Sequence, residues 1–230
     1  MKLQTSALSL LILLNFLFLP SASHAQQHAT AGLRIYLARH GQTNWNLEGR
    51  TQGQTDTALN ATGRRQAGEL KSQMAGISLD AVYSSTLSRS RETAEIVHGK
   101  TPLISLPGLR ERNFGKFQGR LESDPQTGPE FQKRRTIAED SLDGGESLNT
   151  FFDRVRATID DIRKQRPSGT ILIVGHLETN RMILRSLLGL TAAQAMSIMQ
   201  DNNELYMIEI EPSRSPRLWK FVGAGNLKDL

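Results

Sequence analysis

The chain has 230 residues, of which 38% are hydrophobic and 22% are charged, and this composition fits one globular domain with a full core. Its net charge is +5, but the one run of basic residues, 133–135, has no aromatic residues interleaved with it, so we expect a small anionic partner and no nucleic acid. The chain has no cysteine, which excludes disulfides, thiolate metal ligands and a lipid-modified cysteine.

The first 25 residues have the pattern of a secretory signal peptide. Lys2 precedes an apolar run from Ala7 to Leu19, and the small residues Ser23 and Ala25 suit a signal peptidase. The alternative is an uncleaved membrane anchor, but the run is short for a bilayer span. We therefore expect cleavage after Ala25, an exported protein (periplasmic or secreted), and no stable membrane association afterwards.

Strand-like and helix-like segments alternate through the rest of the chain. In chain order, strands are predicted at 33–38, 79–83, 102–106, 170–174, 205–210 and 218–222. Helices are predicted at 61–75, 86–98, 146–166, 178–188 and 192–200. This alternation indicates an α/β fold, a three-layer sandwich whose mostly parallel central sheet is covered by helices on both faces.

The segment 121–143 interrupts the alternation. It has no clean periodicity and contains Pro125, Gly128 and Pro129, which is typical of a functional loop. We call it the lid and assign residues 33–230 to one domain that contains it. Its basic run, Lys133, Arg134 and Arg135, either contacts the far end of an anionic substrate or is an ordinary solvated group of charges.

Two histidines directly follow predicted strands. His40 lies between Arg39 and Gly41, and His176 follows Gly175. Ligands of open α/β sheets bind beyond the carboxyl ends of the strands. Each histidine alone could be a buried structural residue, but together with arginines they indicate phosphoryl transfer, because a neutral imidazole is a nucleophile near neutral pH. His40 is then the candidate nucleophile and His176 a second donor to the phosphate.

Three further residues complete this candidate site. Arg39 and Arg89 are planar donors suited to phosphate oxygens, although Arg89 alone would be read as a solvated helix residue. Glu111 is the candidate general acid, a role that requires a raised pKa; a surface ion pair with Arg110 or Arg112 is equally compatible with the sequence. No pattern for a metal, nucleotide or dinucleotide site is present, so we expect no metal and no cofactor.

The chain resembles the histidine phosphatase superfamily, in its phosphoglycerate-mutase-like branch. Five motifs carry the resemblance in the family's order: Arg39-His40-Gly41-Gln42-Thr43-Asn44-Trp45-Asn46 with Gly49-Arg50, Gln52-Gly53, Asp56 and Leu59; Tyr83-Ser84-Ser85 with Leu87, Arg89, Thr93 and Ala94; Leu109, Glu111, Phe114-Gly115 and Gly119; Gly144-Gly145-Glu146-Ser147-Leu148; and Val174-Gly175-His176. They span about Leu33 to Arg181, nearly all of the sequence after the predicted leader.

The resemblance implies a phosphohistidine mechanism on an α/β sandwich. His40 would be phosphorylated, Glu111 would act as acid and then base, and Arg39, Arg89 and His176 would surround the phosphate. Asn46 matches a further phosphate-contacting position, and Gln52 and Gly53 match positions near the substrate. One residue departs from the pattern: Leu177 stands where the family has glycine, which puts the substrate in question.

We therefore expect a metal-independent phosphomonoesterase that acts on a small phosphorylated substrate. The alternatives are a phosphoglycerate mutase, an isomerase that must shield its phosphohistidine from water, and a catalytically inactive phospho-ligand binding protein. The similar mutases have a longer central insertion and tail than this compact chain, and the five candidate residues together disfavour the inactive protein. The natural substrate and the oligomeric state do not follow from the sequence.

Overall fold

The computed structural model describes residues 32–222 and 226–229, with side chains up to residue 220. The predicted signal peptide lies outside these ranges. The strands are β1 Leu33–Arg39, β2 Ala81–Ser85, β3 Leu103–Leu106, β4 Gly169–Gly175, β5 Leu205–Ile210, β6 Arg217–Val222 and β7 Asn226–Asp229. The helices are α1 Asn44–Leu47, α2 Ala61–Gln73, α3 Ser88–Val97, α4 Gly128–Arg134, α5 Leu148–Gln165, α6 Leu177–Leu188 and α7 Ala192–Ser197, with 3-10 turns at Pro107–Leu109 and Gly115–Phe117.

The strands form one sheet in the order β3-β2-β4-β1-β5-β6-β7. The pairs β3·β2, β2·β4 and β4·β1 are parallel, whereas β5, β6 and β7 pair antiparallel. Five of the seven strands therefore run in one direction, which confirms the predicted, mostly parallel α/β sheet. Arg39 lies opposite Gly175 in the central β1·β4 pair, so the residues after both strands emerge side by side at the same edge.

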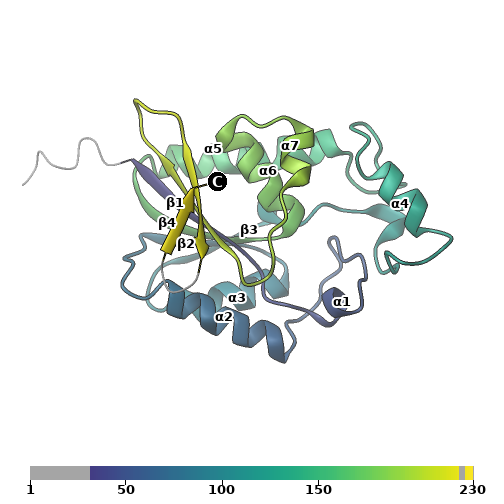
Figure 1. Cartoon of the computed structure of the whole chain (residues 1–230), viewed down its shortest axis with the longest axis horizontal. Coiled ribbons are helices and arrows are strands. Elements are labelled where there is room, and N and C mark those ends of the chain that lie inside the picture. Colours follow the sequence, from purple (N-terminus) through teal and green to yellow (C-terminus); the bar gives the residue numbers. More distant parts are fainter. Residues whose placement is uncertain (1–31, 223–225, 230) are drawn as a thin grey trace, which may run out of the picture.

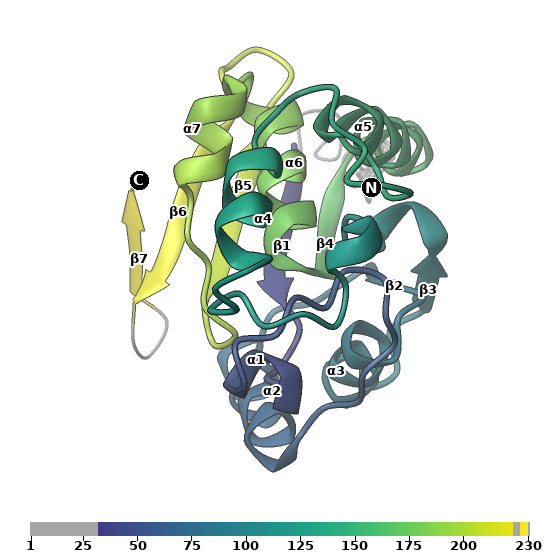
Figure 2. The ribbon, with the colours of Figure 1, turned by 90° about the vertical axis from the view of Figure 1, so that its right-hand side faces the viewer.

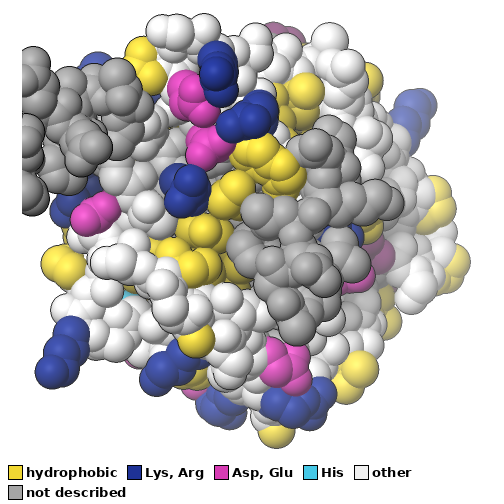
Figure 3. Space-filling model, turned by 60° about the vertical axis from the view of Figure 1, so that its left-hand side comes forward, with side chains coloured by type: hydrophobic (Ala, Val, Ile, Leu, Met, Phe, Trp, Pro, Cys, Tyr) yellow, Lys and Arg dark blue, Asp and Glu magenta, His cyan; other side chains and the backbone are white. Residues whose placement is uncertain are grey.

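Helices cover both faces of the sheet (Figure 1). Successive strand side chains point to opposite faces, and the core divides accordingly. Ile35 and Leu37 belong to the cluster that includes α5, α6 and α7, whereas Tyr36 and Ala38 pack with α2 and α3. On one exposed face, hydrophobic side chains lie among interspersed basic and acidic ones (Figure 3).

Local caps explain where several helices begin. Asn60 accepts a hydrogen bond from the backbone N–H of Gly63 and starts α2 at Ala61, where the predicted helix 61–75 begins. The predicted helix 146–166 begins at Leu148 instead, because Ser147 is its N-cap and accepts from the N–H of Thr150. The predicted helix 192–200 ends early, at Ser197, and Gln200 is buried against the backbone of β1.

Two short helices that periodicity did not predict lie beyond the carboxyl end of β1. Figure 1 places α1 and α4 beyond the same end of the sheet, and Figure 2 faces this edge. Helix α4 lies inside the lid and is held by a small separate core of Phe114, Phe117, Phe131 and Leu142. No helix in the described part of the chain is both long and apolar enough to cross a bilayer.

Candidate active site

His40 follows β1 and is held by its own backbone. Its N–H donates to the carbonyl of Gly175 (3.0 Å), and its carbonyl accepts from the side chain of Asn202 (2.6 Å). The next residue must be small, because a Cβ on Gly41 would lie 2.3 Å from the carbonyl oxygen of Gly63 in α2. The sequence Arg-His-Gly thus brings the imidazole to the sheet edge where α2 packs closely against the chain.

The imidazole of His40 is fixed in one tautomer. Nδ1 lies 2.7 Å from the carbonyl oxygen of Gly41, which can only accept, so Nδ1 carries the proton. Nε2 therefore has a lone pair, and it accepts from Nε of Arg89 at 3.2 Å. The ring is buried, and burial together with the charges of Arg89 and Arg39 lowers its pKa well below 6.5. At neutral pH, the imidazole of His40 is therefore uncharged, with an unprotonated Nε2.

Two arginines lie beside this nitrogen. Arg89 is in the first turn of α3 and is only 1% exposed, so it is not a solvated helix residue. Its terminal nitrogens donate to the carbonyls of Gly53 (2.7 Å) and Thr55 (3.0 Å). Arg39 donates to the carbonyl of Gln200 (3.0 Å), and its buried Nε has no hydrogen-bond partner. Because carbonyls and the imidazole supply no formal charge, the pair attracts an anion.

His176 lies beside His40 at the end of β4. The ring centroids are 5.0 Å apart and the rings are inclined by 58°. Nε2 of His176 is 2.8 Å from the hydroxyl of Ser85, which also accepts from the N–H of Leu87, whereas the buried Nδ1 has no partner. Burial, followed by the charge of Arg89, lowers the pKa of His176 well below 6.5. A second neutral imidazole, with no hydrogen-bond partner at Nδ1, thus lies next to that of His40.

The carboxyl group of Glu111 lies at the amino end of α6. Oε1 accepts from the backbone N–H groups of Arg112 (3.0 Å) and Thr179 (3.2 Å), whereas Oε2 accepts only from the N–H of Glu178 (3.3 Å). The hydroxyl of Thr179 lies 3.2 Å from Oε1 and 3.0 Å from the carbonyl oxygen of Arg110, to either of which it can donate. Glu111 is 7% exposed and is not a surface ion pair. Burial, and then the negative charge of Glu178, raises its pKa; the backbone donors and Arg89 oppose this shift.

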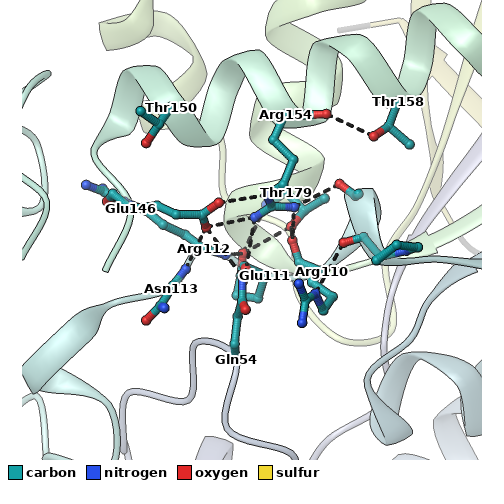
Figure 4. Close-up of polar contacts among 12 residues, drawn as sticks. Gln54, Arg110, Glu111, Arg112, Asn113, Glu146, Thr150, Arg154, Thr158 and Thr179 are labelled. Atoms are coloured by element: carbon teal, nitrogen blue, oxygen red, sulfur yellow. Dashed lines mark hydrogen bonds and ion pairs between the residues drawn. The ribbon is translucent and has the colours of Figure 1, made fainter. Parts of the chain in front are cut away.

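A half-buried arginine, Arg154, holds the loop that carries Glu111 (Figure 4). Arg154 of α5 forms a two-pronged ion pair with Glu146 (2.7 and 2.8 Å). Its remaining N–H groups donate to the carbonyls of Gly108 (2.8 Å), Arg110 (3.1 Å) and Glu111 (3.3 Å). Gln54 also donates to the carbonyl of Glu111, at 3.0 Å. Together, Arg154 and Gln54 fix the backbone on either side of the carboxyl group.

The residues of the candidate site line a cavity of about 80 Å³. This volume is much smaller than the roughly 300–1,000 Å³ of sites for drug-sized ligands. The residues that line it are Arg39, His40, Asn46, Arg50, Thr51, Gln52, Gly53, Arg89, Glu111, Phe114, Glu122, Phe131, Arg135, Leu177 and Glu178. They include Asn46, Gln52, Gly53 and Leu177, the four positions predicted to lie near the substrate. His176 is not among the lining residues, although its ring centroid lies 5.0 Å from that of His40.

Three of those four positions are fixed by local structure. The side-chain carbonyl oxygen of Asn46 caps α1 by accepting from Thr43, and that of Gln52 accepts from the hydroxyls of Thr43 and Thr57. Gly53 has φ +56°, which favours glycine, and its carbonyl accepts from Arg89. Leu177, the first residue of α6, is half-buried at the cavity wall.

The basic run of the lid divides into residues in different environments. Arg134 pairs with Glu130, Asp140 and Asp143, so it holds the lid together. Of the three, only Arg135 lines the cavity, where it pairs with Glu178. The three basic residues therefore do not share one role, and the contacts of Arg134 do not support its binding to the far end of a substrate.

Sequence reasoning missed Glu178, Arg154 and the segment that contains Gln200 and Asn202. Glu178 directly follows Leu177, the residue that departs from the family pattern. This position next to Leu177 was the only sign in the sequence that Glu178 belongs to the site. Arg154 occupies an ordinary position in an amphipathic helix, and Gln200 and Asn202 are joined to β1 only by tertiary contacts. Among the residues that the structure describes, no group of His, Asp and Glu could hold a metal ion.

Comparisons with known proteins identify the family of the chain. Residues 35–221 match the model of the histidine phosphatase superfamily (branch 1). A protein of Shigella boydii named "Probable phosphoglycerate mutase GpmB" is 33% identical over 197 residues, which cover 83% of this chain and 89% of that protein. The chain therefore belongs to the histidine phosphatase superfamily.

Solved structures of phosphatases share the fold. The alpha-ribazole phosphatase of Shigella flexneri has a TM-score of 0.69 at 27% identity and covers 78% of this chain and 91% of its own. A phosphoserine phosphatase of Entamoeba histolytica, solved with phosphoserine, has a TM-score of 0.68 at 26% identity. The match covers 80% of this chain and 96% of that protein's chain. The relatives thus include proteins named as phosphatases and as a mutase.

Proposed function

We propose that the protein is a metal-independent phosphomonoesterase that acts through a phosphohistidine intermediate on a small phosphorylated substrate. The observation that carries this proposal is the unprotonated Nε2 of His40, which the Gly41 carbonyl fixes beside Arg89 within reach of the cavity. The substrate phosphate would take the place beside Nε2, with Arg39 and Arg89 donating to its oxygens.

In the first step, the lone pair of His40 Nε2 attacks phosphorus and the bond to the leaving oxygen breaks. Glu111 gives its proton to that oxygen, so the product leaves as an alcohol. Oε2 is the oxygen of Glu111 suited to carry the proton, because Oε1 accepts from two backbone N–H groups and Oε2 from only one. The raised pKa of Glu111 favours its acid form.

In the second step, water attacks the phosphohistidine. Glu111, now a carboxylate, takes a proton from the water, and the electron pair of the N–P bond returns to Nε2. His176 stabilises the phosphoryl group if the hydroxyl of Ser85 donates to its Nε2, since the proton of His176 then lies on the unpartnered Nδ1. The bound dianion also raises the pKa of His176 and favours its charged form.

A phosphoglycerate mutase is the second candidate function, and the name of the Shigella boydii relative favours it. The two phosphatase structures favour hydrolysis. Purified protein without its first 25 residues should hydrolyse p-nitrophenyl phosphate in the presence of EDTA. A requirement for diphosphoglycerate would identify a mutase instead, and inactivity on a broad panel of phosphoesters would identify an inactive phospho-ligand binding protein.

The nucleophile has a direct test. His40→Ala should abolish turnover, because it removes the proposed nucleophile. The far-ultraviolet circular dichroism spectrum should be unchanged, because the imidazole takes no part in the backbone hydrogen bonds of the sheet. Rapid acid-free quenching of the wild-type protein during turnover should trap a phosphorylated peptide that contains His40. Substantial activity in the variant, or phosphate on another residue, would contradict the assignment.

A further inference from the structure

Glu178 is a buried acidic residue directly beside the proposed general acid. It is 2% exposed, lines the cavity, and donates its backbone N–H to Oε2 of Glu111. Its side chain is not needed for either proposed step. A buried carboxylate is retained only where nearby cations or donors compensate it. The partners of Glu178 therefore indicate which substrate charge this wall of the cavity can accept.

One oxygen of Glu178 binds two guanidinium groups and the other binds none. Oε1 accepts from Arg135 of the lid and from Arg181 at 2.8 Å. Arg181 is directed away from the cavity, since its other nitrogens contact the carbonyl of Ile198 (2.7 Å) and the sulfur of Met199 (3.0 Å). Arg135 is therefore the cation that Glu178 neutralises at the cavity wall. Oε2 is buried without a hydrogen-bond partner.

The two ends of the cavity consequently differ in charge. At the His40 end, the side-chain nitrogens of Arg39 and Arg89 bind carbonyl groups and the imidazole, and their charges are available for a phosphate. Beside Leu177, the charge of Arg135 is already paired with Glu178, and Arg50, the remaining arginine of the lining, pairs with Glu48 at 3.0 Å. The site therefore provides cationic charge for the phosphoryl group but little for the rest of the substrate.

Building on the proposed function, we propose that the leaving group is a neutral, hydroxyl-bearing alcohol, as in a sugar or polyol phosphate, and that Glu178 selects against leaving groups that carry a carboxylate. A carboxylate at this end would face Glu178 and would have to compete with it for Arg135. A hydroxyl adds no charge, so it neither repels the carboxylate of Glu178 nor competes with it for Arg135.

The wild-type protein provides the first test, with two three-carbon primary phosphoesters of similar size. The kcat/KM for glycerol 3-phosphate should exceed that for 3-phosphoglycerate by about tenfold or more. Equal values, or a preference for 3-phosphoglycerate, would overturn the inference and leave the proposed function intact. Failure to hydrolyse p-nitrophenyl phosphate as well would overturn the proposed function itself.

Two substitutions should move this selectivity in opposite directions. Glu178→Gln keeps the shape and frees Arg135, so the ratio of the two kcat/KM values should fall by about tenfold. Arg135→Gln leaves Glu178 less compensated, so the ratio should rise and hydrolysis of phosphoethanolamine, whose leaving group is cationic, should increase relative to glycerol 3-phosphate. Ratios within one variant cancel any general loss of activity.

The matched control is Glu95→Gln, in an exposed ion pair with Arg91 on α3. It removes the same charge far from the cavity and should leave the ratio unchanged. If Glu178→Gln fails to fold, the wild-type preference and the Arg135→Gln variant still decide the question. A ratio that moves in the same direction in both cavity variants would contradict the proposed charge pairing.

Discussion

At the scale of single residues, the site sets the protonation states that the reaction needs. The pKa of His40 is lowered, so the proposed nucleophile stays neutral below pH 6.5, and the pKa of Glu111 is raised, so the proposed acid keeps its proton above pH 4.5. Burial is the largest cause of both shifts, because it disfavours the charged form of each group. Both shifts act in the direction that the proposed first step requires, towards a neutral imidazole and a protonated carboxyl group.

Glu111→Gln should reveal the acid role through the leaving group. For glycerol 3-phosphate, whose leaving alkoxide needs a proton, kcat should fall by about 10²–10⁴-fold. For p-nitrophenyl phosphate, whose leaving group needs little help, the loss should be much smaller. Wild-type kcat/KM for glycerol 3-phosphate should also decrease as rising pH removes the proton from Glu111, and this limb should be absent in the variant. Equal slowing of both substrates would contradict the assignment.

The sequence showed which residues reach the sheet edge but not what surrounds them. Arg39, His40 and His176 could be placed because each lies at the carboxyl end of a predicted strand. Glu178 could not be distinguished from an ordinary first-turn acid of a helix, since its burial depends on Arg135, 43 positions earlier in the chain. Likewise, the tautomer of His40 depends on a backbone carbonyl whose direction no local pattern specifies.

At the scale of helices and strands, long elements were predictable and short ones were not. Helices α2, α5 and α6 are long enough to show a periodic apolar face. By contrast, α1 has four residues and α4 has seven, and each depends on specific side-chain contacts: α1 on the Thr43–Asn46 capping box and α4 on the phenylalanine cluster. Both lie beside the cavity, so the least predictable elements are those that shape it.

Arg154→Lys tests whether α5 positions the general acid. Lysine keeps the charge but cannot form the two-pronged bond to Glu146 while donating to the loop of Glu111. We expect kcat for glycerol 3-phosphate to fall by about tenfold or more, with a smaller effect on p-nitrophenyl phosphate and little change in KM. Arg156→Lys, in an exposed pair with Asp153 on the same helix, is the control. A uniform loss on both substrates would indicate a structural role only.

At the scale of the whole molecule, the order of strands explains why one edge holds every part of the site. Strands β1 and β4 are central parallel neighbours, so the two histidines that follow them are adjacent although they are far apart in the sequence. The antiparallel strands β5, β6 and β7 extend the other side of the sheet, and the segment before β5 returns Gln200 and Asn202 to the backbone of β1 and His40. Local periodicity indicates strands but not their order or direction.

Export is a separate prediction about the whole chain. When the full sequence is expressed in a bacterial host, we expect mass spectrometry of the intact protein to show a chain that begins at Gln26, recovered from outside the cytoplasm. Replacing Leu13 with arginine should interrupt the apolar run and retain the uncleaved chain inside the cell. Cleavage elsewhere, or none in the wild-type protein, would contradict the predicted signal peptide.

The buried histidines also make global stability depend on pH. Because the folded-state pKa values of His40 and His176 are lowered, their contribution is fully present above the unfolded value of about 6.5 and is lost as pH falls towards the folded values. Glu111 acts in the opposite sense, since its raised pKa adds stability as pH falls. Urea midpoints at pH 7.5 and 5.5 should therefore decrease on acidification in the wild-type protein and decrease less in His40→Ala, which lacks one of the two groups. An equal or larger decrease in the variant would show that His40 is not held neutral by burial.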